Sequence, residues 1–212
     1  MRPPIEATND TSHLNSVPDS YIEYPKRKYG MDHDRYDWSL LVKRKPVEWP
    51  HAARIALWVV PALEFFPLDT PVKPFKAPGG MVTPYPDLRH YTLRDYGNRV
   101  GIFRVMKALD ALGIKASVAV NSKVAQRYPF LIDEINRRKW EIIAHGVDMA
   151  TLHYGGLDEA AEAAQVKEAL GVLREAAAGP VRGWLSPAKS QSPATPDLVA
   201  AEGVDYMCDW IN

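Results

Sequence analysis

Apolar residues recur at strand-like and helix-like spacings from residue 54 onward. Short continuous apolar runs predict buried strands, and longer stretches with apolar residues three or four positions apart predict helices. The expected strands lie at 55–60, 116–120, 141–144, 181–185 and 204–208. The expected helices lie at 98–112, 123–138 with a break at Pro129, 158–178 and 196–202. Because strands that alternate with helices pair in parallel, the pattern predicts an α/β fold.

Two stretches lack this periodicity. Residues 1–52 contain prolines among charged and aromatic residues, which predicts an irregular N-terminal arm before a domain at 53–212. Residues 21–49 are too aromatic for a disordered segment, so the arm is expected to wrap a barrel surface or a neighbouring subunit, and a homo-oligomer is possible. Residues 67–95 are rich in proline and glycine and predict a long loop, of the kind that often forms lids or binding loops.

Composition narrows the classes of function. Lys plus Arg and Asp plus Glu both number 26 in 212 residues, which argues against a nucleic-acid partner or an anionic membrane surface. Cys208 is the single cysteine and excludes an internal disulfide or a Cys-based zinc site. Residues 1–10 lack the pattern of a secretory signal, and the apolar run at 55–63 is too short to span a bilayer. A cytoplasmic protein is therefore expected.

Polar and charged residues follow the predicted strands at their carboxyl ends, where parallel α/β folds place their working groups. In strand order they are Glu64 and Asp69, then Asn121 and Ser122, then His145, Asp148 and His153, then Ser186, Lys189 and Ser190, and finally Asp209 and Trp210. Arg182 lies on the fourth predicted strand itself. Carboxylates, imidazole and a cation around one mouth could support acid–base hydrolysis.

Several of these segments, in this order, resemble the NodB-homology (polysaccharide deacetylase) family. They lie at 96–104, 112–120, 140–146, 181–187 and 203–210. Arg54-Ile55-Ala56 at the first strand, and Gly146 after His145, are most similar to the allantoinase-like branch. The resemblance covers residues 50–212 and implies a deformed, incomplete (β/α) barrel that hydrolyses non-peptide C–N bonds. Five strands are too few to close such a barrel, so a C-terminally incomplete domain is expected.

The resemblance also implies roles for single residues. Glu64 matches the general base of the family, but Phe65 stands at the next position, where the family has a metal ligand. His145 matches the first of two histidines four residues apart, and Met149 replaces the second. A phenyl ring cannot bind a metal and a thioether is a poor ligand for a hard or borderline ion, so two of the three expected ligands are missing.

A divalent metal site, for example for zinc, could be rebuilt from His145, Asp148 and His153. Because the usual ligand set is incomplete, action without a metal is favoured. In the implied reaction Glu64 activates water and His145 polarises the carbonyl or binds an ion, while Arg182 and Asp209 hold the other groups in place. Trp184 and Trp210 are the candidates for lining a substrate pocket.

The substrate is expected to be an N-acyl carbohydrate or a small cyclic amide, and the missing export signal slightly favours the small amide. Each residue also has a structural interpretation: a core histidine for His145, a surface salt bridge for Arg182, and barrel packing for Trp184 and Trp210. The competing function is a catalytically inactive, deacetylase-like binding or structural subunit.

Overall fold

The computed structural model describes residues 35–36, 39–68 and 88–210. The chain divides into two units, Met1–Leu57 with Tyr154–Gly156, and Trp58–His153 with Leu157–Asn212. In its described part the first unit contains two short 3-10 turns, η1 (Leu41–Lys43) and η2 (Pro50–Ala52). The irregular arm and its boundary after residue 52 stay predictions, and most of the loop expected at 67–95 lies outside the described residues.

The second unit is built on a five-stranded parallel sheet with the strand order β1-β2-β3-β4-β5. The strands are β1 (Ala62–Leu63), β2 (Ser117–Val120), β3 (Glu141–Ala144), β4 (Gly183–Trp184) and β5 (Tyr206–Met207). Each strand pairs with its neighbour in sequence, so β1 and β5 are the edges of the described sheet. This progressive order is that of (β/α) barrels and lacks the reversal found in doubly wound sheets.

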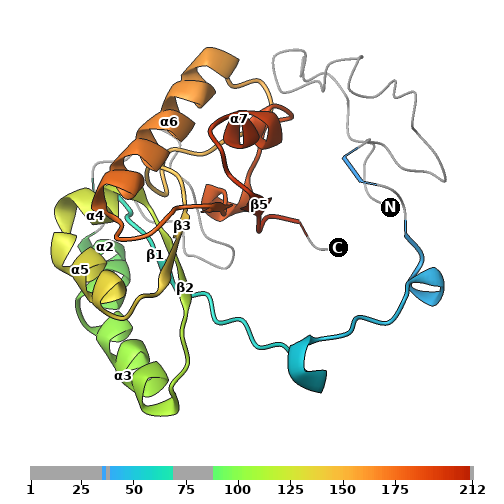
Figure 1. Ribbon diagram of the computed structural model, residues 1–212. Helices are drawn as coiled ribbons and strands as arrows, with labels where there is room; N and C mark the ends of the chain where they lie inside the picture. Colours follow the sequence, from blue (N-terminus) through green and yellow to red (C-terminus); the bar gives the residue numbers. More distant parts are fainter. Residues whose placement is uncertain (1–34, 37–38, 69–87, 211–212) are drawn as a thin grey trace, which may run out of the picture. The chain divides into compact units, whose positions relative to one another are not determined.

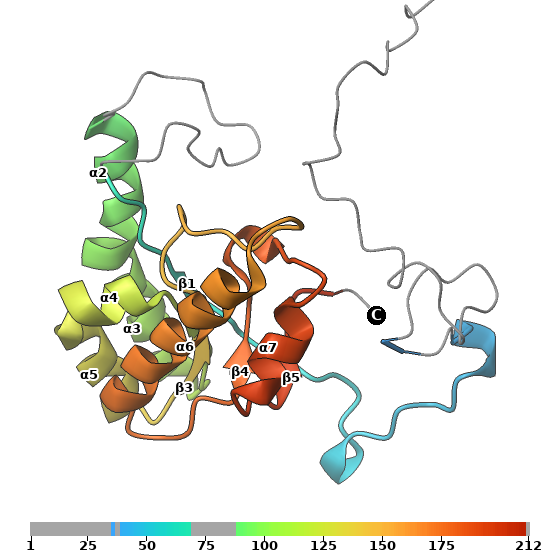
Figure 2. The same ribbon diagram turned by 90° about the horizontal axis from the view of Figure 1, so that it is seen from above.

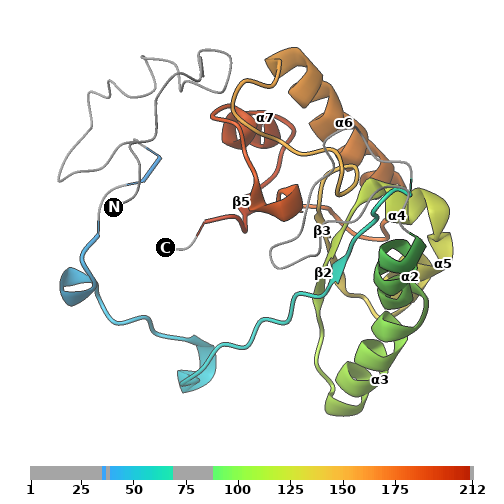
Figure 3. The same ribbon diagram turned by 180° about the vertical axis from the view of Figure 1, so that it is seen from behind.

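Helices connect the strands and lie on one side of the sheet (Figure 1, Figure 3). They are α2 (Leu88–Tyr96), the π-helical turn η3 (Gly97–Gly101), α3 (Ile102–Leu112), α4 (Ser122–Arg127), α5 (Pro129–Arg137), α6 (Glu159–Ala176), the 3-10 turn η4 (Pro187–Lys189) and α7 (Thr195–Ala201). α6 packs against both α4 and α7 (Figure 2). None of the described helices is both long enough and apolar enough to cross a membrane.

Side chains alternate between the two faces of the central strands. The apolar core beneath the helices takes the even-numbered residues of β2 and β3, which are Val118, Val120, Ile142 and Ala144. Because successive side chains of a strand point to opposite faces, the odd-numbered residues face away from the helices. Ala119 and Ile143 belong to this second set and are fully buried as well. The second face is therefore an interior surface too, as in a barrel.

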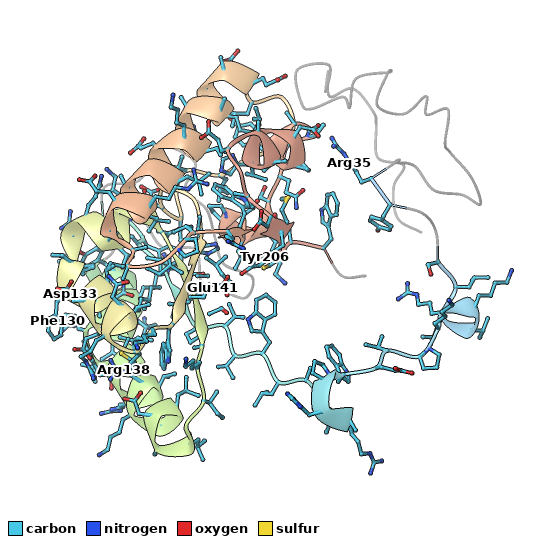
Figure 4. The ribbon with its side chains drawn as sticks, in the orientation of Figure 1. Arg35, Phe130, Asp133, Arg138, Glu141 and Tyr206 are labelled. Carbon is cyan, nitrogen blue, oxygen red and sulfur yellow. The ribbon has the colours of Figure 1, made fainter. Side chains whose placement is uncertain are left out.

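Polar and aromatic side chains join the strands across this interior face. Trp58 Nε1 donates to Ser117 Oγ (2.9 Å), and Ser117 Oγ donates to Glu141 Oε2 (2.6 Å). Tyr206 Oη donates to Glu141 Oε1 (2.6 Å), and Figure 4 shows these two side chains next to each other. The rings of Trp58 and Tyr206 meet edge to face with their centroids 6.3 Å apart. A flat sheet would hold β1 and β5 about 19 Å apart, so this sheet is strongly curved.

The first predicted strand is wrong in position. Residues 55–60 contain no strand, and Ile55 and Leu57 are 82% and 72% exposed. Backbone pairing with β2 begins only at Val59, whose carbonyl oxygen accepts from the Ser117 amide. The apolar run indicated that a strand is present, but it did not indicate which of its residues pair with β2.

The first predicted helix begins ten residues earlier than expected. Helix continues from α2 through η3 into α3, although the sequence placed its start at Asn98 and treated the preceding residues as loop. The described side chains of α2 include none that is buried, so no apolar stripe marks this helix in the sequence.

The other predicted elements are confirmed, with small differences at their ends. Pro129 separates α4 from α5, because it can begin a helix but not continue one. Gly113 ends α3 in the left-handed conformation, with φ of 65°. Asp158 caps α6, where its Oδ1 accepts from the Ala161 amide at 2.8 Å.

Candidate active site

Glu64 and His145 meet at the carboxyl ends of β1 and β3. His145 Nε2 lies 3.4 Å from Glu64 Oε1, and His145 Nδ1 lies 2.6 Å from the carbonyl oxygen of Leu185. A carbonyl oxygen only accepts, so Nδ1 carries a proton. Nε2 faces the Glu64 carboxylate and is the ring nitrogen that can exchange a proton with it.

Solvent reaches the two members of this pair unequally. The Glu64 side chain is 35% exposed, whereas that of His145 is 3% exposed. Water and a substrate can therefore contact Glu64 directly, while His145 lies behind it. An accessible carboxylate backed by a covered imidazole can take up a proton from water and release it again, which is the requirement for general acid–base catalysis.

Two buried asparagines fix the backbone of this pair. Asn121, directly after β2, accepts from the Phe65 amide through Oδ1 (2.8 Å) and donates through Nδ2 to the carbonyl oxygen of His145. Asn98, in the π-helical turn η3, donates to the carbonyl oxygen of Glu64 (2.9 Å). Sequence reasoning placed Asn121 near the site but missed Asn98. A polar residue on the buried side of the predicted helix was its only sequence signal.

Asp209 lies after β5 and is 8% exposed. Its Oδ1 accepts from the Ser186 amide (2.7 Å) and its Oδ2 from Gln191 Nε2 (2.8 Å). Burial raises the pKa of the Asp209 carboxyl, although these donors and the charge of His145 act in the opposite direction. Trp210 is 45% exposed and donates from Nε1 to Gln191 Oε1 (3.1 Å). Gln191, which the sequence did not single out, therefore connects Asp209 to Trp210.

The structure does not bring Arg182 to the site. Arg182 precedes β4, at the opposite end of the strands from Glu64 and His145. Its side chain is 63% exposed, and its Nε lies 3.6 Å from Oδ2 of the equally exposed Asp205. Such surface pairs contribute little to stability. The expectation that Arg182 orients a catalytic carboxylate is not met by this geometry.

Trp184 packs in the apolar core and does not line a pocket. It is fully buried, and its Nε1 donates to Ser186 Oγ (2.8 Å). Asp69 lies outside the described residues, so its position relative to the site is not described.

The expected metal ligands are not gathered around His145. Asp148 Oδ1 accepts from the amides of Ala150 (2.9 Å) and Thr151 (2.8 Å), so Asp148 stabilises the turn that contains it. His153 is 1% exposed, and its Nδ1 faces Glu162 Oε1 at 3.1 Å. Among residues 35–36, 39–68 and 88–210, no three His, Cys, Asp or Glu side chains are grouped closely enough to hold a metal ion.

The two positions where the family has metal ligands are occupied here by apolar side chains that are also buried. Phe65 and Met149 are 8% and 4% exposed. Both ring nitrogens of His145 already have partners, the Leu185 carbonyl oxygen and the Glu64 carboxylate. Within the part of the chain that the structure describes, the side chains at this site therefore do not fit a bound divalent ion.

A small crevice beside Glu64 is lined by residues that the sequence did not indicate. Its outer wall comes from α2 and η3, with Tyr91, Arg94, Asp95 and Asn98. The Arg94 guanidinium lies 4.0 Å from the centre of the Phe66 ring, and Tyr128 Oη donates to Asp95 Oδ1 at 3.2 Å. The wall carries both signs of charge next to the exposed carboxylate.

Comparisons with known proteins add to this geometry. Residues 90–207 match the family model named polysaccharide deacetylase. The solved structure of Puue allantoinase is similar, with 26% identity, a TM-score of 0.64, and coverage of 89% of this chain and 61% of that chain. A Pseudomonas aeruginosa protein described as a "probable polysaccharide deacetylase" gives 26% identity, a TM-score of 0.65, and coverage of 85% and 59%. No curated protein matches the sequence.

The chain spans 61% and 59% of the lengths of these two solved structures. The progressive strand order and the strong curvature of the sheet agree with both similarities. The expected fold class, an incomplete (β/α) barrel of the NodB-homology type, is confirmed.

Proposed function

The chain belongs to the polysaccharide deacetylase family, and from this premise we propose that it hydrolyses an amide-type C–N bond. The observation that carries the proposal is the contact between the exposed Glu64 carboxylate and the covered His145 imidazole. The substrate is an N-acyl carbohydrate or a small cyclic amide. Similarity to a deacetylase structure supports the first, and similarity to an allantoinase structure supports the second.

In the proposed reaction Glu64 acts as the general base. His145 Nε2 faces the Glu64 carboxylate and orients it toward the water molecule. Glu64 takes a proton from a water molecule while the water oxygen bonds to the amide carbonyl carbon. The protonated Glu64 then gives this proton to the leaving nitrogen and the C–N bond breaks. The acid and the amine are released, and Glu64 is a carboxylate again.

Other side chains hold this pair in its working state. Asn98 and Asn121 fix the backbone on both sides of the contact. Asp209 interacts electrostatically with His145. In this proposal Arg182 and Trp184 have no catalytic or binding role.

The test of the proposal is Glu64→Gln, which keeps the side-chain shape and removes the base. We expect kcat to fall about 10²- to 10⁴-fold with a much smaller change in KM. Acetate release from an N-acetylated sugar oligomer and ring opening of allantoin are the two assays. Glu168→Gln, at an exposed position of α6, is the matched control and keeps full activity. An unchanged kcat in Glu64→Gln would refute the base role, and a wild-type chain inactive on both substrates would favour a binding or structural subunit.

We further propose that the reaction needs no metal ion, because Phe65 and Met149 replace two ligands and both nitrogens of His145 are engaged. Treatment with EDTA followed by desalting is expected to leave kcat unchanged, and added Zn²⁺ is expected not to raise it. Activity that EDTA abolishes and Zn²⁺ restores would contradict this prediction.

A further inference from the structure

A second ionisable pair is buried in the same unit, outside the candidate active site. His153 lies between β3 and α6 and is 1% exposed, and Glu162 lies in the first turn of α6 and is 0% exposed. His153 Nδ1 is 3.1 Å from Glu162 Oε1, and Thr195 Oγ1 donates to the same oxygen. Burial alone would raise the pKa of Glu162, but the hydrogen bonds from His153, Ser192 and Thr195 lower it below its ordinary value. Glu162 is therefore a buried carboxylate.

A buried pair of ionisable groups contributes little net stability, even where both are charged. Moving two charges out of water costs several kcal/mol for each ion, and apolar side chains of similar volume are often at least as stable in the same place. Removing one partner is costly, however, because the other charge is then left buried alone. What such a pair supplies is a fixed geometry for the segments that it joins.

Here the joined segments are the loop after β3, which contains His153, and the loop between β4 and α7. Thr195 begins α7 and binds Glu162, and Ser190 Oγ donates to the carbonyl oxygen of His153 (2.5 Å). The β4–α7 loop also contains Ala188 and Lys189 with φ of 56° and 54°. Left-handed backbone costs about 1–2 kcal/mol per non-glycine residue, so the loop needs contacts from outside to keep this shape.

The same loop also contacts residues of the candidate active site. Its first residue, Leu185, supplies the carbonyl oxygen that binds His145 Nδ1. Ser186 and Gln191 donate both hydrogen bonds that Asp209 accepts. The β4–α7 loop therefore contacts His145 and Asp209 through Leu185, Ser186 and Gln191, and it contacts the buried pair through Ser190 and the start of α7.

The backbone next to His145 is in close contact with this loop at Gly146. Gly146 follows His145 and has a φ of 65°, and a Cβ at this position would lie 2.5 Å from Pro187 Cγ. The same Cβ would lie 3.9 Å from His153 Nε2. The backbone next to His145 is thus packed directly against the β4–α7 loop and beside the His153 ring.

We infer that His153 and Glu162 are positioning residues that set the protonation pattern of His145. They hold the β4–α7 loop so that the Leu185 carbonyl oxygen keeps the proton on His145 Nδ1, which leaves Nε2 facing Glu64. The importance of this pattern for catalysis rests on the proposed function, but the coupling itself does not.

The test is the nitrogen-15 NMR spectrum of the histidine side chains in the full chain, with His145→Asn used to assign the His145 signals. In the wild type we expect a slowly exchanging proton on His145 Nδ1. In Glu162→Ala we expect that proton to exchange faster and the Nδ1 and Nε2 shifts to move toward those of mixed tautomers. Glu159→Ala removes the same charge from the same turn of α6 at an exposed position, so it is expected to leave the His145 signals unchanged.

Thr195→Val keeps the charge and the shape, and it removes only the hydroxyl bond to Glu162. We expect Thr195→Val to shift the His145 signals in the same direction as Glu162→Ala. If Glu162→Ala does not fold, Thr195→Val provides the test in its place. Wild-type His145 signals in a folded Thr195→Val or Glu162→Ala variant would overturn the inference. The NMR measurement uses no substrate. A chain inactive on both substrates would therefore refute the proposed function, whereas only the NMR result tests the role of His153 and Glu162.

Discussion

At the scale of single residues, Asp209 is a carboxyl group with little access to water. Burial raises its pKa above the ordinary value of 3.8. The folded chain therefore keeps the proton on Asp209 to a higher pH than the unfolded chain does. The resulting stabilisation is fully present below pH 3.8 and is lost as the pH rises through the pKa of the folded state.

Asp209→Asn removes this titration. We expect the free energy of unfolding of the variant, relative to the wild type, to increase as the pH rises from 3.8 toward neutrality. Urea unfolding across this range measures the difference. Asp133→Asn, at an exposed position of α5 that Figure 4 labels, is the control and shows no such trend. A constant difference between Asp209→Asn and wild type at all pH values would contradict the prediction.

The sequence could place some site residues but not others, for physical reasons. Glu64, His145 and Asp209 follow strands directly, and parallel pairing brings their ends together whatever the exact register. Arg182 failed because it lies at the amino end of its strand, which is predicted at 181–185 and begins two residues later, at Gly183, in the structure. The orientation of Trp184 could not be read either, since a strand of two residues shows no alternation.

At the scale of elements, one side chain links β3, β4 and β5 in addition to their backbone pairing. Tyr206 on β5 pairs in register with Gly183 on β4 and reaches across it to Glu141 on β3. Burial and Glu141 raise the pKa of the Tyr206 hydroxyl. A Cβ at Gly183 would lie 2.4 Å from Tyr206 Cζ, so the ring has room only because position 183 has no side chain.

Gly183→Ala is therefore expected to push the Tyr206 ring away from Glu141 and to cost about 1–3 kcal/mol of stability. In a Tyr206→Ala background the same substitution is expected to cost almost nothing, because the clash is gone. Urea unfolding of the two single variants and the double variant gives the coupling energy. Equal costs of Gly183→Ala in both backgrounds would show that the ring is not the cause.

The elements that the sequence placed correctly are those that bury an apolar face. Strands β2 and β3 are buried on both sides, and α3 buries Ile102, Met106 and Leu109 along one stripe. α2 was missed because its stability does not come from such a stripe. The shift of β1 has a related cause, since an apolar run of nine residues contains several equivalent registers and only pairing with β2 selects one.

At the scale of the whole molecule, the described part of the arm carries apolar side chains that are not covered within its own unit. Leu41, Val42 and Val47 are 81%, 89% and 71% exposed. Contiguous exposed apolar residues are typical of interaction surfaces. The arm covering the barrel surface and the arm covering a neighbouring subunit both stay predictions from the sequence.

We expect the full chain to be oligomeric and Leu41→Ser combined with Val42→Ser to lower its mass to that of one chain. Light scattering after size-exclusion chromatography measures this mass. Leu112→Ser, at an exposed position at the end of α3, is the control and keeps the oligomer. A wild-type chain that is already monomeric would refute this role of the arm.

The strand order has a further consequence for how the molecule forms. Each strand pairs with the one made just before it, so every β–α segment that leaves the ribosome finds its partner strand already synthesised. The contact between Glu64 and His145 closes a separation of 81 residues and cannot form before β3 is in place. Asp209 joins last, after β5. During synthesis Glu64 therefore reaches His145 only after β3 has formed, and Asp209 joins them only after β5.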